Sequence, residues 1–178
     1  MLARKKREIS IVVDTSVLQA AGGPGRPNLV SKNCTEALMT IKKDFFVACT
    51  QDLFGEWLSH KARLSYFSSM WLVDMRLKGC LNVVPPPPGL RERLEKCLTD
   101  KFGSGVGSLR DIHLIESAVA SDNRIVSRDN TAYIHFATCC DAVPELHDIL
   151  WANPEDKDTL QWLKDSAPKN KDFLLCSV

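Results

Sequence analysis

The chain has 178 residues, of which 44% are hydrophobic and 25% charged, and its formal net charge is +1. This size and composition are typical of one globular domain that folds without a disulfide or a metal staple. The charge excludes a strongly basic, histone-like binder but leaves room for a local phosphate-binding patch. No apolar run approaches the roughly 18 residues of a membrane span. The apolar run at 9–13 is also shorter than a signal-peptide core, which is about 7–15 residues long. We therefore expect a cytoplasmic protein.

The apolar pattern predicts strands alternating with helices. In chain order, we expect a strand at 9–13, a helix at 31–43, a strand at 45–49, a helix capped by Thr50, a helix at 65–78, a strand at 81–84, an exposed charged helix at 91–101, a helix at 108–121, a strand at 124–127, and helices at 133–140 and 158–165. Loops are expected at 22–27 and 103–107, and a stiff polyproline spacer at 85–88.

Strands that alternate with helices indicate right-handed crossovers and a parallel sheet. We therefore predict an α/β fold, a three-layer sandwich whose central, mostly parallel sheet is flanked by helices. Residues 8–140 are expected to form the main domain. Residues 141–178 are expected to be a C-terminal extension packed on it.

The seven cysteines form neither a Cys-x-x-Cys pair nor a Cys/His zinc pattern. An odd number of cysteines without a signal peptide predicts free thiols in a reducing cytosol. Cys34, Cys80 and Cys97 are expected to be small core or boundary residues. Cys139 and Cys140, although adjacent, are not expected to form a redox device.

Four acids stand where ligand sites of α/β sheets lie, beyond the carboxyl ends of the strands. Asp14 and Asp129 follow strands, whereas Glu56 and Asp111 lie in or near helices that reach the same edge. Four converging carboxylates repel one another unless a cation neutralises them, and Mg²⁺ and Mn²⁺ prefer such oxygen ligands. A site of this kind is suited to phosphodiester hydrolysis.

Each acid also has a purely structural interpretation. Asp14 can close a turn with Thr15 and Ser16, and Asp129 can serve a turn before Asn130. Glu56 can lie on a solvated helix face and pair with His60, while Asp52 and Asp74 compete for its role. Asp111 can belong to a capping box that starts at Ser108.

Three segments resemble the motifs of PIN-domain nucleases in the right order and spacing. They are Ile-Val-Val-Asp14-Thr-Ser-Val-Leu, the segment Gln51–Leu58 around Glu56, and the segment from Asp111 to Asp129 with its closing Ser-Arg-Asp. The resemblance covers about residues 8–140. It implies that Asp14, Glu56, Asp111 and Asp129 are catalytic ligands of Mg²⁺ or Mn²⁺. Ser16 would position Asp14 or the metal-bound water, and Ser127 would take the place of a Thr or Ser near the site.

The resemblance further implies a metal-dependent endoribonuclease acting on single-stranded RNA. The alternative is a catalytically weak or inactive PIN-like module for RNA binding or assembly. The chain is similar to VapC-like toxins, which are inhibited by an antitoxin protein. It differs from those compact toxins in its tetraproline segment, in its glycine-rich loop and in its C-terminal extension. A P-loop NTPase is excluded because the loop at 22–26 lacks the required Lys-Ser/Thr.

Two basic side chains beside the acids, Arg110 and Arg128, are the best candidates for contacts with substrate phosphates. Together with Ser16 and Ser127 they form the predicted substrate-binding set. The aromatic and methionine residues of helix 65–78 are expected to lie mainly in the core. If part of that helix is exposed, it is a candidate surface for a homodimer or for an inhibitory protein.

Overall fold

The computed structural model describes residues 7–25 and 28–177. In chain order its main elements are β1 (Ser10–Val13), α1 (Thr15–Ala20), α2 (Leu29–Asp44), β2 (Phe46–Cys49), α3 (Gln51–Ser59), α4 (Tyr66–Leu77), β3 (Leu81–Val83), α5 (Leu90–Phe102), α6 (Ile112–Val119), β4 (Arg124–Val126), α7 (Asn130–Ala137), β5 (Leu150–Ala152) and α8 (Thr159–Lys164). Short 3₁₀ turns connect several of them. The basic residues 1–6 and part of the loop expected at 22–27 lie outside the described residues.

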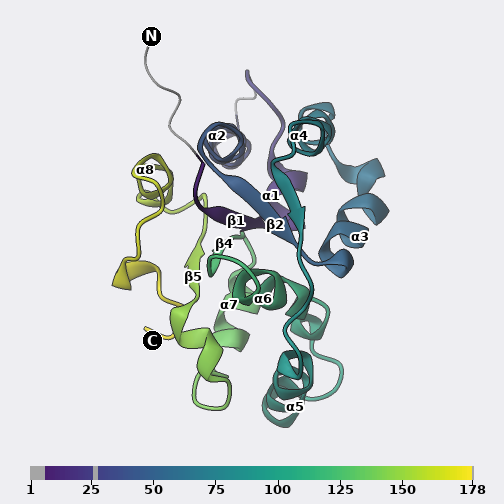
Figure 1. Ribbon diagram of the computed structural model, residues 1–178, viewed down its shortest axis with the longest axis vertical. Helices are drawn as coiled ribbons and strands as arrows, with labels where there is room; N and C mark the ends of the chain where they lie inside the picture. Colours follow the sequence, from purple (N-terminus) through teal and green to yellow (C-terminus); the bar gives the residue numbers. More distant parts are fainter. Residues whose placement is uncertain (1–6, 26–27, 178) are drawn as a thin grey trace.

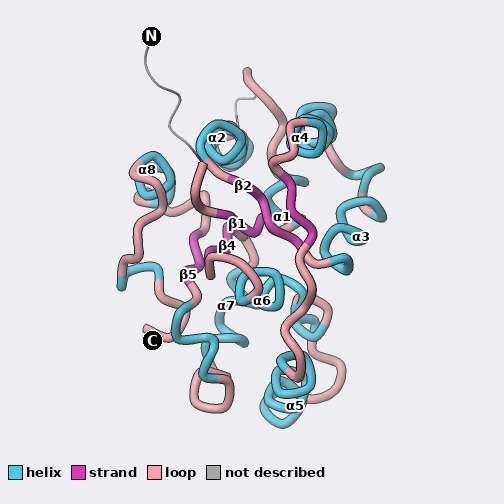
Figure 2. The backbone as a smooth tube through the Cα atoms, in the orientation of Figure 1, coloured by secondary structure: helices cyan, strands magenta, loops and turns pink. Residues whose placement is uncertain are grey.

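The strands form one sheet in the order β3-β2-β1-β4-β5, and every neighbouring pair is parallel. Helices cover both faces of this sheet, with α2 and α6 on opposite sides (Figure 1). Figure 2 shows the strands as a central layer between helices. The predicted three-layer α/β fold is confirmed. Continuous apolar runs such as Ile11–Val13 form the central strands because both of their faces are buried.

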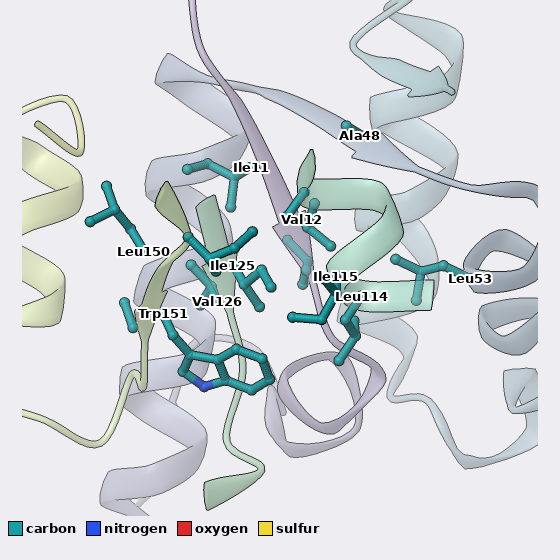
Figure 3. Close-up of a cluster of buried hydrophobic side chains, with 14 of the residues drawn as sticks. Ile11, Val12, Ala48, Leu53, Leu114, Ile115, Ile125, Val126, Leu150 and Trp151 are labelled. Carbon is teal, nitrogen blue, oxygen red and sulfur yellow. The ribbon is translucent and has the colours of Figure 1, made fainter. Parts of the chain in front are cut away.

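The hydrophobic core fills both sides of the sheet, and Figure 3 shows the part of it that involves β1, β4 and α6. Ile11 and Val12 of β1, Ile125 and Val126 of β4, and Ile115 of α6 are all fully buried. Helix α6 is buried on almost every side, because residues Ile112–Ala118 are all shielded from solvent. A helix enclosed in this way fixes the position of the residue at its N-terminus, Asp111.

The C-terminal residues add a fifth strand that the sequence did not predict. Leu150–Ala152 pairs with β4, with Ile125 opposite Trp151, and α8 packs against α2. A three-residue strand is too short to show a periodic pattern. The six-residue helix α1 was missed for the same reason. Residues 141–177 therefore continue the same sheet and layers as the preceding chain.

Two predictions about helix faces were wrong. The helix predicted at 91–101 to be exposed buries Leu90, Leu94 and Leu98 along one stripe, because its apolar residues repeat every four positions. Leu58, which the pattern assigns to the apolar face of α3, is 54% exposed. Helix α3 instead buries only Leu53 and Trp57.

The prediction of free thiols was wrong for four of the seven cysteines. Disulfides join Cys97 to Cys139 and Cys140 to Cys176, whereas Cys34, Cys49 and Cys80 are free and buried. The pairs are separated by 42 and 36 residues in the sequence, so their spacing shows no local motif. The fold brings their Cα atoms within 6.0 and 5.9 Å. Free cysteines therefore no longer support the expectation of a reducing compartment.

In the part of the chain that the structure describes, no helix has the length and apolar character needed to cross a membrane.

Candidate functional site

Asp14 lies at the carboxyl end of β1 and is only 7% exposed. Its Oδ2 atom accepts hydrogen bonds from the hydroxyl groups of Ser16 and, at 2.6 Å, of Ser127 at the end of β4. Burial raises the pKa of Asp14, and the two serine hydrogen bonds act against this rise without cancelling it. Both predicted serines thus hold the Asp14 carboxylate in place.

Asp129 is linked to Asp14 through Ser127. The backbone N–H of Asp129 donates to the Ser127 hydroxyl at 2.9 Å. Its Oδ1 atom accepts from the N–H of Ala132 at 2.8 Å, so the side chain caps α7. The expectation that Asp129 has a local structural role before Asn130 is therefore correct for its Oδ1 atom. Its Oδ2 atom has no partner among the described residues.

Asp111 stands at the N-terminal end of α6 and does not cap it. The expected capping box is absent, because the Ser108 hydroxyl instead lies 2.8 Å from Nδ1 of His135. Burial and the nearby carboxylates of Asp14 and Asp129 raise the pKa of Asp111 to about 7. Glu56 adds a smaller effect in the same direction, so the negative charges of all four predicted acids are close enough to interact.

A shallow pocket of about 290 Å³ opens in front of these acids. Asp111 and Asp129 line it, together with Arg110, Gly107, Ser108 and Thr131. Arg110 is exposed and forms no ion pair with any described residue. Arg128 differs, because its Nε atom donates to Glu155 at 2.7 Å and its backbone N–H donates to Ser16. Of the two arginines predicted to contact phosphates, Arg110 is therefore the one without an ion pair among the described residues.

Glu56 projects from α3 toward α6, where its Oε2 atom lies 2.8 Å from Nε2 of His113. Burial raises the pKa of Glu56, but His113, together with Thr15 and His60, outweighs that effect, so the pKa is lowered. Burial lowers the pKa of His113, but the carboxylates of Glu56, Asp111 and Asp14 outweigh it and the pKa is raised. Sequence reasoning missed His113, although its place two residues after Asp111 on a buried helix is a usable signal.

Asp52, the expected substitute for Glu56, belongs to a different network. Arg91 donates to Asp52 and, through two nitrogens, to the buried Glu116. Glu56 contributes to the raised pKa of Asp111. The other competitor, Asp74, pairs with Lys42. Of the three acids, Glu56 is the one that faces the cluster.

A divalent cation fits this site by donor chemistry, because carboxylate oxygens are its preferred ligands. The arrangement of these side chains does not yet match a metal-binding site. Within residues 7–25 and 28–177, no group of three or more His, Cys, Asp or Glu side chains is arranged to hold a metal ion. Asp14 uses one oxygen for two serine hydroxyls, and Asp129 uses one for its helix cap. The acids therefore form a cluster of negative charge, but they do not form a complete set of metal ligands.

Comparison of the chain with protein-family models, with curated protein sequences and with solved structures finds no match.

Proposed function

We propose that this protein is a PIN-like, metal-dependent endoribonuclease that hydrolyses single-stranded RNA at the cluster of Asp14, Asp111 and Asp129. The observation that carries the proposal is that these acids meet at one edge of the sheet: the Ser127 hydroxyl bonds to both Asp14 and Asp129, and the two carboxylates together with burial raise the pKa of Asp111 to about 7. Such repulsion at the carboxyl edge of a parallel sheet is costly unless a cation relieves it. The first and last of the three motifs that resemble PIN nucleases contribute these same acids, and the middle motif contributes Glu56.

Mg²⁺ or Mn²⁺ would be held by Asp14, Asp111 and Asp129, and would supply an activated water and charge neutralisation at the phosphate. The protein's own groups prepare the site. Ser16 and Ser127 orient the Asp14 carboxylate, and the Ser127 hydroxyl also accepts from the N–H of Asp129. Arg110, exposed at the pocket, would attract the RNA backbone.

Glu56 acts from the far side of the cluster in this proposal. Its pairing with His113 keeps it ionised and places a compensating positive charge behind the acids. We therefore assign Glu56 a positioning role rather than that of a direct metal ligand. A cytoplasmic site of action would follow from the RNA substrate, but disulfides are rare in that reducing compartment, so Cys97–Cys139 and Cys140–Cys176 count against this part of the proposal.

The alternative is an RNA-binding or assembly module without activity. It is favoured by the absence of a metal-holding group among the described residues and by the hydrogen bonds that already occupy Asp14 and Asp129. The two functions differ in one respect: the module would bind RNA equally well in a chelator and would leave it intact.

The test is cleavage of a labelled single-stranded RNA in Mn²⁺, in Mg²⁺ and in excess chelator. Asp14→Asn and Asp111→Asn should lower the rate by about a hundredfold or more, which corresponds to at least about 2.7 kcal/mol. Asp148→Asn is the matched control, because Asp148 is an exposed acid that pairs with Lys169 and precedes β5, at the end of the parallel strands opposite to the cluster. Equal cleavage by all four proteins, or cleavage that survives the chelator, would overturn the proposal.

A further inference from the structure

Four consecutive prolines at 85–88, the proline segment, connect the edge strand β3 to α5, and the proposed cleavage chemistry uses none of them. Figure 2 shows this connection as a long loop that leads from β3 to α5. A proline ring fixes φ at about −65°, and a residue that precedes a proline is held in an extended conformation. Residues 84–87 each precede a proline and lie outside any helix or strand, so they form a short polyproline II helix.

The fold clamps the proline segment at both ends. The N–H of Val84 donates to the carbonyl of Cys49 in β2 at 2.9 Å, and the N–H of Leu90 donates to the carbonyl of Pro87 at 3.4 Å. Gly89 has φ 71° and ψ −2°, which is the third position of a type II turn with the last proline before it. Leu90 is fully buried. The segment is therefore held in one conformation before any partner binds.

The exposure of the residues follows the threefold repeat of a polyproline II helix, in which side chains three positions apart share a face. Val84 and Pro87, three positions apart, are half-buried, and Val84 packs against the hydrophobic core. Pro85 and Pro88 form the next such pair and are exposed, as is Pro86 on the third face. One face of the segment therefore rests on the protein, and two faces are open to solvent.

The open faces offer only apolar rings and hydrogen-bond acceptors. Proline has no backbone N–H, so the segment presents no donor of its own. No backbone N–H of the described residues donates to the carbonyls of Pro85 and Pro86. A surface without donors or positive charge does not attract the phosphates of RNA. Trp and Tyr side chains match it, because each combines an apolar ring with an N–H or O–H donor.

Protection of the sheet edge accounts for only part of the segment. Proline cannot donate to a strand ladder, so a proline directly after β3 stops the pairing of this edge with another strand. One proline is enough for that purpose. The other three, and the two open faces that they create, need a different explanation.

The arginines that follow the segment are engaged within the chain. Arg91 pairs with Asp52 and with the buried Glu116, and Arg93 pairs with Glu145. Recognition by a partner therefore depends on the proline rings and carbonyls and not on a free positive charge. Grooves lined with aromatic side chains recognise proline-rich segments in this way, and a ligand that is already ordered loses less entropy on binding.

We propose that the proline segment is a docking site for a partner protein that binds it in a groove lined with aromatic side chains. The exposed rings of Pro85, Pro86 and Pro88 fill the spaces between the partner's rings, and a Trp or Tyr of the partner donates to the free carbonyls. The segment follows β3, which β2 separates from β1 and from Asp14 at its end. The docking site is thus distinct from the acid cluster and does not depend on the nuclease function.

The first experiment is calorimetric titration of the full chain with two recombinant domains that carry aromatic grooves, a WW domain and an SH3 domain. At least one of them should bind. Its affinity should change less than about twofold between low and high salt, because no new ion pair forms. No binding by either domain, or an affinity that falls steeply with salt, would overturn the proposal.

Variants then locate the binding site. The double variant Pro85→Ala with Pro86→Ala removes two exposed rings and keeps every carbonyl, and it should weaken binding about tenfold or more. Pro168→Ala is the matched control, because Pro168 is an exposed proline outside the segment. A synthetic peptide of residues 81–90 should displace the full chain from the domain, a result that does not depend on how the variants fold. Equal affinities of the double variant and the control, or a peptide that does not compete, would overturn the assignment.

Discussion

The hydroxyl of Ser127 donates a 2.6 Å hydrogen bond to the carboxylate of Asp14, a residue 113 positions earlier in the chain. The bond joins the carboxyl ends of β1 and β4, which are neighbours in the sheet. Because the same hydroxyl oxygen accepts from the N–H of Asp129, one buried serine fixes two of the clustered acids. The site is therefore held by the sheet itself and not by a flexible loop.

Ser127→Ala should destabilise the protein, because it leaves the buried Asp14 carboxylate and the Asp129 N–H with one partner fewer. We expect a loss of roughly 1–3 kcal/mol in the free energy of unfolding. Urea denaturation followed by circular dichroism measures it. Thr138→Ala removes an exposed hydroxyl that bonds only to a local carbonyl, and should cost much less. Equal losses in the two variants would show that Ser127 has no special role.

The stability of the metal-free protein should fall as pH rises through the range set by Asp111. Its pKa is about 7 in the folded protein, against an ordinary value of 3.8. Between these values the folded state holds a proton that the unfolded chain has released, so stability is lost as pH rises and the full cost is present above pH 7. The cost is roughly 2–4 kcal/mol.

The measurement is urea unfolding in a chelator at pH 5 and pH 8. Asp111→Asn should remove much of the difference between the two and should be the more stable protein at pH 8. Addition of Mn²⁺ at pH 8 should stabilise the unmodified protein and have little effect on the variant. A variant with the same pH slope as the unmodified protein would contradict the assignment of the repulsion to Asp111.

The pair of Glu56 and His113 should stabilise the fold over a different pH range. Folding lowers the pKa of Glu56 from 4.5, so the stability that Glu56 contributes is lost as the pH falls through its pKa in the folded protein. Folding raises the pKa of His113 from 6.5, so the stability that His113 contributes is lost as the pH rises through its pKa in the folded protein. Both groups are charged at about pH 5.5. A double-mutant cycle with Glu56→Gln and His113→Gln should give a coupling of roughly 1–3 kcal/mol there and less at pH 9. A coupling independent of pH would argue against an ion pair.

The disulfide pairing predicts a fixed count of reactive thiols. Alkylation of the denatured protein without reductant should modify the three free cysteines, Cys34, Cys49 and Cys80, and with reductant all seven. Replacing Cys140 and Cys176 with serine should lower the free energy of unfolding by roughly 2–4 kcal/mol. Seven reactive thiols before reduction would refute both disulfides.

Helix α4 leaves an apolar face in solvent while its other face enters the core. Tyr66, Met70, Val73 and Leu77 are between 40% and 82% exposed and repeat at helical spacing, whereas Trp71 and Met75 are buried. The expectation that this helix lies mainly in the core is thus correct for one face only. We expect the exposed face to form a homodimer, since exposed apolar patches mark interfaces.

Light scattering at high micromolar concentration should show a dimer for the unmodified protein and a monomer for Leu77→Lys. Lys78→Ala changes an exposed neighbour at the end of the same helix and should stay dimeric. A monomeric unmodified protein would exclude the homodimer, and the same face would then be tested for binding to an inhibitory protein.

The sequence by itself predicted the features that depend on local pattern. The run Ile11–Val13 is short and β-branched, which favours a buried strand, and Thr50 accepts from the N–H of Leu53 as expected of a helix cap. The order of these elements was enough for the parallel α/β sheet. The position of Asp14 and Asp129 after strands was enough to put both at one edge.

Only the tertiary structure decided which side chains meet. Ser127 with Asp14, His113 with Glu56 and Arg91 with Glu116 join elements that are distant in the chain or lie on different layers. The two disulfides and a hollow lined by Trp151 depend on where the C-terminal residues return to the sheet. Hydrophobic periodicity records whether a residue is buried, but it carries no information about its partner, because many pairings of the same elements bury the same apolar surface.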